Sequence, residues 1–108
     1  MRELELIGAL ERMLAPAGAA AASAGRRVVR WIGDDAAVVR AGGSYAVTSV
    51  DTSVDGVHFR AGQLSFDEIG HRALGSALSD LAAMGANAGE AYLALALPPG
   101  GVALPALR

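Results

Sequence analysis

Groups able to hold a metal ion or a phosphate gather where a β-rich stretch of the chain ends. Residues 45–50 (Tyr-Ala-Val-Thr-Ser-Val) favour a pleated, half-buried strand, and the character changes at Asp51. Two carboxylates, two hydroxyls, a glycine and a histidine follow within residues 51–58. A strand that ends in oxygen ligands and a turn delivers them to one end of a sheet, where a metal ion or a phosphate can bind.

A second acidic point, Gly33-Asp34-Asp35, comes before residues 36–40, which also favour a strand. Residues 41–44 (Ala-Gly-Gly-Ser) are typical of a turn, so the two strands form an antiparallel hairpin. The acidic pair enters the first strand and Asp51 leaves the second. These ends are neighbours in a hairpin, so we expect Asp34 or Asp35 near Asp51. The alternative is that Gly-Asp-Asp is only a turn, where aspartate is common.

A third acidic point, Asp80, lies on a predicted helix. Ser65 and Glu68 form a capping box, and the helix should run to about Met84 and stop at Gly85. On a helical wheel Asp80 falls at the edge of the apolar face, where a carboxylate is costly to bury without compensation. Metal ligation would compensate it, and so would a hydrogen bond to the helix or to a neighbouring loop. Close approach to the sheet would explain two glycines inside this helix, Gly70 and Gly75.

The two histidines have different surroundings. His71 lies near the polar boundary of the predicted helix, and we expect an ordinary surface residue. His58 lies in the loop after the acidic strand end, between Val57 and Phe59. It is either a semi-buried structural histidine or a ligand contact.

The remaining segments are expected to provide packing. Residues 3–14 form a short amphipathic helix, and residues 15–25, rich in alanine and glycine, are a flexible connection or an extension of that helix. Residues 28–32 are a short apolar run. Residues 90–97 alternate small and large apolar side chains, which predicts a third strand buried on both faces. Residues 101–108 are short and weakly patterned.

Composition narrows the possible functions. The chain has 108 residues, 53% of them hydrophobic, and a net charge of −2, which suits one soluble domain. It has no cysteine, so disulfides and thiolate chemistry are excluded, and a cytoplasmic location is compatible. All nine basic residues are arginines, so a lysine-dependent phosphate loop is impossible. The arginines are scattered and no apolar run is long enough to span a membrane, so neither nucleic acid nor membrane is an expected partner.

Taken in order, the acidic stretches resemble the N-terminal region of the thiamine-monophosphate kinase family. That family belongs to the superfamily of aminoimidazole ribonucleotide synthetase and selenophosphate synthetase. The matching motifs are Gly33-Asp34-Asp35-Ala36-Ala37, residues 51–59 and residues 78–86. The last is shared in outline across the superfamily, whereas the first two point to the thiamine branch. The resemblance runs from residue 5 to residue 99.

The resemblance implies transfer of the γ-phosphate of ATP onto thiamine monophosphate, which makes thiamine diphosphate, with magnesium ions bridging the phosphates. It implies metal contacts from Asp35, Ser49, the backbone of Val50, Asp51 and Asp80. It also implies that His58 contacts the thiamine substrate, and it implies no covalent nucleophile. Hard cations prefer oxygen ligands, and phosphoryl transfer depends on positioning and charge neutralisation, so the implied site agrees with the residue types.

The resemblance also sets expectations for the fold and its partners. The expected fold is α+β, a mostly antiparallel sheet with helices packed on one face. Residues 1–108 would be an incomplete N-terminal domain that binds ATP and magnesium. In the family, N-terminal sheets from two subunits combine, which implies a homodimer.

Several departures from the family pattern leave other functions open. Ala77 stands where the family usually has asparagine, and residues 15–27 are a looser connection than usual. A glycine-glycine-aspartate nucleotide motif and the C-terminal domain of the family are not in the sequence, so we expect a fragment with little activity of its own. One alternative is another ATP-dependent synthetase of the superfamily, which His58-Phe59 and the Gly-Asp-Asp motif disfavour. The other is a non-catalytic module that binds metal or dimerises.

Overall fold

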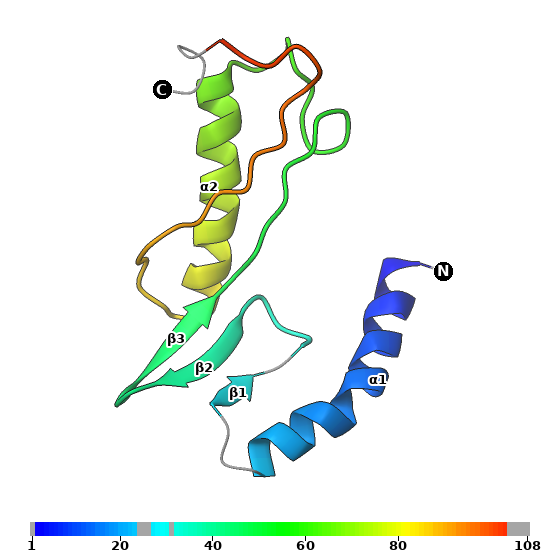
Figure 1. The fold of residues 1–108 in the computed structure, drawn as a ribbon, viewed down its shortest axis with the longest axis vertical. Coiled ribbons are helices and arrows are strands. Elements are labelled where there is room, and N and C mark those ends of the chain that lie inside the picture. Colours follow the sequence, from blue (N-terminus) through cyan, green and yellow to red (C-terminus); the bar gives the residue numbers. More distant parts are fainter. Residues whose placement is uncertain (1, 24–26, 31, 104–108) are drawn as a thin grey trace.

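Two helices and a three-stranded antiparallel sheet make up the computed structural model, which describes residues 2–23, 27–30 and 32–103 (Figure 1). The fold class is therefore α+β with an antiparallel sheet, as predicted. The strands follow each other in the sheet in the order β1-β2-β3. Helix α1 lies beyond the β1 side of the sheet and helix α2 lies beyond the end of β3 (Figure 1).

The predicted hairpin is confirmed. Strand β2 spans Ala37–Ala41 and β3 spans Ser44–Thr48, with Ala37 opposite Thr48 and Ala41 opposite Ser44. Gly42 and Gly43 form the connection, and Gly42 has a φ of 62°. Residues other than glycine rarely adopt this left-handed conformation, so the Gly-Gly sequence suits the tight turn.

Strand β1 (Val28–Arg30) pairs antiparallel with the other edge of β2. Its register shifts between Val28 and Arg30. Just before the strand, the Arg40 amide donates to the Arg27 carbonyl at 2.6 Å, and the Arg27 guanidinium donates to the Arg40 carbonyl at 3.1 Å. The first residues of the apolar run 28–32 thus form an edge strand, while residue 31 lies outside the described residues.

Helix α1 spans Glu3–Ser23, which is longer than the predicted 3–14. Of the two interpretations of residues 15–25, helix extension is correct as far as Ser23; residues 24–25 lie outside the described part. Alanine has the highest helix propensity, which favours this extension. Pro16 lies inside the helix and has no N–H to donate to the Arg12 carbonyl. The helix axis bends along its length (Figure 1).

Helix α2 spans Phe66–Ala83 and has the boundaries that its sequence signals predict. The Ser65 hydroxyl accepts from the Glu68 amide, and the Glu68 carboxylate accepts from the Ser65 amide at 2.7 Å. At the other end, Gly85 has a φ of 66°, its amide donates to Ala82, and the Ala86 amide donates to Leu81. This pair of bonds is a Schellman motif, which satisfies carbonyls left free at the helix end.

The predicted strand at residues 90–97 is wrong. The structure gives this segment no strand, and the chain runs back toward the N-terminal end of α2 as an extended connection (Figure 1). The residues alternate as a strand would, but a strand also needs a hydrogen-bonded neighbour. None of the other described segments pairs with residues 90–97.

The described residues bury little of their apolar surface. Ala36, at the start of the hairpin, is the only buried residue in the described part of the chain, and it is 5% exposed. Helix α2 has no buried residue, and its apolar face is only half-buried at Ile69, Ala73, Ala77 and Leu81. The expected close approach at Gly70 and Gly75 is also wrong, because a Cβ placed on either would meet no atom within 4 Å.

Candidate acidic site at the end of the hairpin

The hairpin brings two predicted ligands to the same end of the sheet. Ala37 and Thr48 lie opposite each other at the open end of the hairpin. Asp35 comes two residues before Ala37, and Asp51 comes three residues after Thr48. Both aspartates are exposed. The observed register therefore places the Gly-Asp-Asp turn beside the end of the second strand, as the hairpin predicts.

A hydrogen bond links this end of the hairpin to α2. The Ser49 hydroxyl donates to the carbonyl of Ala77 at 3.3 Å, across a part-buried contact. Asp80 follows Ala77 by three residues, so the two lie on the same face of the helix. The contact thus holds the helix turn that carries Asp80 against the strand end that leads to Asp51. Ser49 keeps its oxygen lone pairs, with which a hydroxyl can still accept or ligate.

The acidic side chains differ in their present partners. Asp34 accepts from the Asp35 amide at 3.0 Å and forms an ion pair with Arg30 at 2.7 Å. Asp51 accepts from the Thr52 amide at 2.8 Å. Asp35 and Asp80 have no side-chain hydrogen bond to another described residue, and Asp80 is half-buried.

These residues do not form a closed metal cage. Within the described ranges, no three histidine or acidic side chains lie close enough together to bind one ion. Their chemistry nevertheless fits magnesium, because three carboxylates, a serine hydroxyl and a backbone carbonyl are all hard oxygen donors. Magnesium commonly uses one or two carboxylates and takes its other ligands from substrate phosphates and water. An arrangement of separate carboxylates around one end of the hairpin suits that use.

His58 lies in a compact loop after the acidic strand end. It is exposed, which disagrees with the semi-buried alternative. Its ring Nδ1 accepts from the Val54 amide at 3.0 Å, and its own amide donates to the Val54 carbonyl at 2.9 Å. Asp55 closes the loop by accepting from the Ala61 amide at 2.8 Å. Sequence reasoning counted Asp55 among the possible oxygen ligands and gave Val54 no role, although an aspartate in a Gly-containing loop commonly accepts from a backbone amide a few residues on.

Helix α1 contributes one acidic side chain that sequence reasoning also missed. A Cβ at Gly33 would collide with the Glu11 carboxylate, so this carboxylate lies against the backbone of the Gly-Asp-Asp turn. Gly33 has a φ of 97°, which other residues rarely adopt. No local sequence signal links positions 11 and 33, since the contact depends on how α1 folds back on the sheet.

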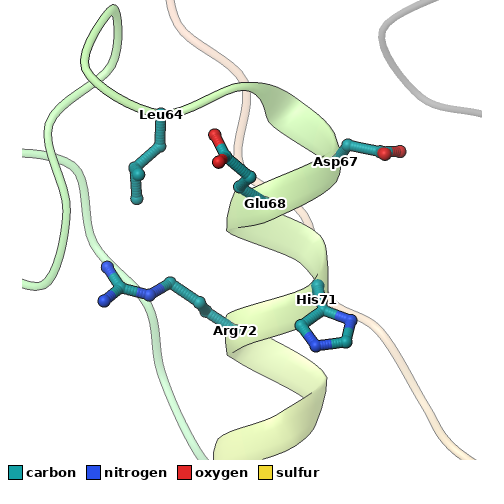
Figure 2. A pocket seen from close by; sticks show the side chains of 5 residues that line it. All are labelled: Leu64, Asp67, Glu68, His71 and Arg72. Atoms are coloured by element: carbon teal, nitrogen blue, oxygen red, sulfur yellow. The ribbon is translucent and has the colours of Figure 1, made fainter.

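A shallow pocket lies at the other end of α2, apart from the acidic points. Leu64, Asp67, Glu68, His71 and Arg72 line it (Figure 2). Hydrogen bonds from the Ser65 backbone, then from its hydroxyl, lower the pKa of Glu68, and Arg72 adds to the effect. His71 is exposed, as expected of a surface residue. The Glu68 carboxylate already accepts hydrogen bonds from Ser65 in the helix cap. We therefore assign no ligand to this pocket.

The sequence from the Gly-Asp-Asp turn onward matches a known protein family. Residues 33–106 match the model of the family described as AIR synthase related protein, N-terminal domain. This match covers more than half of the chain, so the chain belongs to that family.

Curated relatives narrow the comparison. A thiamine-monophosphate kinase of Rhodopirellula baltica is 44% identical over 80 residues, which is 67% of this chain and 25% of that protein. The kinase of the same name from Synechococcus elongatus is 48% identical over 67 residues, 61% of this chain and 20% of that protein. One from Bacillus subtilis is 43% identical over 68 residues, 62% of this chain and 21% of that protein.

The chain thus spans a quarter or less of the length of these relatives. No solved structure matches it. In the described part of the chain, no helix is both long and apolar enough to cross a membrane.

Proposed function

We propose that this chain is the N-terminal part of a magnesium-dependent kinase that transfers the γ-phosphate of ATP to thiamine monophosphate and so makes thiamine diphosphate. The observation that carries the proposal is the identity of 43–48% to three proteins named thiamine-monophosphate kinase. The matched family model includes all three proposed carboxylates, Asp35, Asp51 and Asp80, within residues 33–106.

The residues of the hairpin end would position the phosphates. Asp35, Asp51 and Asp80 would hold magnesium, with Ser49 and the backbone of Val50 as further contacts. Bound magnesium would neutralise the phosphate charges and align the transferred group. The Ser49–Ala77 hydrogen bond supports this arrangement because it ties the strand end to the turn before Asp80. His58 would contact the thiamine substrate from the neighbouring loop.

No side chain in this scheme attacks the phosphate. In the proposed transfer the acceptor phosphate of thiamine monophosphate would itself be the nucleophile, and the protein would contribute position and charge. The chain has arginines but no lysine, so divalent metal is the natural partner for the charge of ATP. These carboxylates alone would repel nucleotide phosphates, so a metal ion is needed between them.

A chimaera tests this function in a full-length setting. The matching N-terminal segment of the Bacillus subtilis relative is replaced by this chain, and formation of thiamine diphosphate from ATP and thiamine monophosphate is followed with magnesium and with chelator. We expect magnesium-dependent turnover in the chimaera and its loss with Asp80→Asn. The 108-residue chain by itself should show little turnover, because it spans at most a quarter of the relatives' length.

Two results would contradict the proposal. One is a folded chimaera that binds ATP but converts no thiamine monophosphate. The other is turnover that Asp80→Asn, Asp51→Asn and Asp35→Asn all leave unchanged. A chimaera carrying Asp67→Asn serves as the matched control, because Asp67 is exposed at the far end of α2 and should not affect turnover.

A further inference from the structure

The loop formed by residues 54–61 holds one histidine by both its backbone and its ring. The His58 amide donates to the Val54 carbonyl at 2.9 Å, and the Val54 amide donates back to His58 Nδ1 at 3.0 Å. The Gly56 amide donates to Phe59 at 2.7 Å, with Gly56 at a φ of 80°. The imidazole of an exposed residue is therefore fixed against its own loop.

The direction of the ring hydrogen bond decides the chemistry that His58 can offer. A backbone N–H can only donate, so Nδ1 must accept and carries no proton. In the neutral ring the proton is then on Nε2. Nε2 has no partner among the described residues, so it is the ring nitrogen available to a ligand. It can donate one hydrogen bond and accept none.

Asp55 fastens the same loop from its other side. Its carboxylate accepts from the Ala61 amide at 2.8 Å, which spans the segment that contains His58. A backbone bridge between Asp55 and Phe59 lies inside this closure. Asp55 is next in sequence to Val54, so fixing Asp55 also restricts the amide that orients the imidazole.

We propose that Asp55 is a positioning residue: it closes the 54–61 loop so that Val54 holds His58 as the neutral Nε2–H tautomer, a donor for an acceptor atom of the bound substrate. The identity of the substrate as thiamine monophosphate rests on the function proposed above. The positioning itself rests only on the hydrogen bonds of the loop.

The tautomer is measured directly by nitrogen NMR on the uniformly ¹⁵N-labelled chain at alkaline pH. His71 is exposed and serves as an internal reference, and His71→Gln assigns the signals. We expect an Nε2–H fraction higher in His58 than in His71, and a through-hydrogen-bond coupling between the Val54 amide and Nδ1. Equal tautomer ratios in the two histidines, or a proton on Nδ1 of His58, would overturn the proposal.

Variants then separate positioning from general stability. Asp55→Ala should lose the coupling and bring the His58 tautomer ratio to that of His71. Asp55→Asn keeps a carbonyl oxygen that can accept from Ala61, so it should rescue both signals. Asp67→Ala removes an exposed carboxylate elsewhere and should change neither. An Asp55→Ala variant that keeps the coupling would show that Asp55 does not position the ring.

Adding thiamine monophosphate and magnesium tests the donor role separately. The Nε2 signal of His58 should shift on binding, whereas the ring signals of His71, the internal reference, should not. A fixed tautomer with no shift at saturating substrate would reject the donor role toward this substrate. It would leave the positioning by Asp55 standing, so the two failures are distinguishable.

Discussion

A single half-buried carboxylate, Asp80, gives the sharpest residue-scale test of the acidic site. It lies near the C-terminal end of α2, where the helix dipole disfavours negative charge. It has no side-chain hydrogen bond to another described residue that could compensate this cost. If magnesium compensates it, Asp80→Asn should abolish the magnesium-induced rise in melting temperature while leaving the metal-free protein as stable as before or slightly more so. Thermal melts with and without magnesium measure both effects.

Asp67→Asn is the control for that experiment, since it removes a charge from the exposed first turn of the same helix. It should leave the magnesium-induced shift unchanged. If Asp80 were instead fixed by a structural hydrogen bond, Asp80→Asn would cost about 1–3 kcal/mol of stability and would not alter magnesium binding. An undiminished magnesium shift in Asp80→Asn would remove this residue from the site.

At the residue scale, the sequence predicted the burial of single side chains better than it predicted which atoms they contact. The edge position of Asp80 on the apolar face follows from helical periodicity alone, and the residue is indeed half-buried. The contact of Glu11 with Gly33 and the hold of Val54 on His58 could not be predicted in this way. Both join a side chain to a backbone atom in a loop, and no periodic pattern records such contacts.

At the element scale, the capping box of α2 should make stability sensitive to acid. Hydrogen bonds from Ser65 lower the pKa of Glu68 in the folded state, so the ionised carboxylate stabilises the folded state relative to the unfolded state. Its contribution is present above the unfolded pKa, near 4.5, and is lost as the pH falls through the lower folded value. The amide oxygen of Glu68→Gln can still accept the capping hydrogen bond but does not titrate. This variant should therefore lose less melting temperature than the parent between about pH 5 and pH 3, which lie on either side of the usual pKa of a carboxyl group.

Ser65→Ala tests the same cap at neutral pH, where it should cost about 0.5–2 kcal/mol of stability. Denaturant unfolding of both variants and the parent gives these values. Hydrogen bonds from Arg2 also lower the pKa of Glu5 in α1. Part of the acid sensitivity should therefore remain in Glu68→Gln. Unaltered acid sensitivity in Glu68→Gln would contradict the assignment to the cap.

Two glycines should respond in opposite ways to alanine. Gly75 lies inside α2 with open space around it, so Gly75→Ala should stabilise the helix by about 1 kcal/mol. Gly33 has a φ of 97° and lies against the Glu11 carboxylate, so Gly33→Ala should destabilise by at least about 1–2 kcal/mol. In a Glu11→Ala background the cost at Gly33 should fall but not vanish. A destabilising Gly75→Ala would show that this helix face is covered in solution.

Elements whose signals are local were predicted well, and elements that need distant partners were not. The bounds of α2 and the β2–β3 turn follow from a capping box, a terminal glycine and a Gly-Gly pair. The extension of α1 to Ser23 was left open because Pro16 argues for a break and the alanines argue for helix. The prediction of a strand at residues 90–97 was wrong because alternating side chains show only which faces a strand would have. They do not show whether another strand lies beside it to form the hydrogen bonds.

At the scale of the whole molecule, the chain exposes more surface than a folded monomer of its size. Its accessible area is 8733 Å², whereas a folded monomer of 10.9 kDa has about 5,600 Å². Its radius of gyration is 17.3 Å, against about 13 Å for a compact domain of this length. The chain thus exposes roughly 3,000 Å² more surface than a folded monomer of its mass would. Obligate dimer interfaces bury roughly 2,000–5,000 Å² in total, so an interface of that size could cover the excess.

We therefore propose that the chain self-associates, and that residues 90–97 take part. Tyr92 is 92% exposed and Leu93 is 85% exposed, and the backbone of this segment donates no hydrogen bond to another described residue. An apolar, unpaired, extended segment can gain both burial and a strand partner from a second copy. Sedimentation equilibrium at micromolar concentration should show dimers or larger species.

Leu93→Asp should weaken this association at least about tenfold, because it places a charge in the newly formed contact, where an unpaired charge costs more than 1.4 kcal/mol. Leu4→Asp is the matched control. Leu4 is 82% exposed on α1, away from the proposed contact, and its substitution should leave the association constant unchanged. A parent chain that sediments only as a monomer would refute self-association. An equal effect of both substitutions would place the contact elsewhere than residues 90–97.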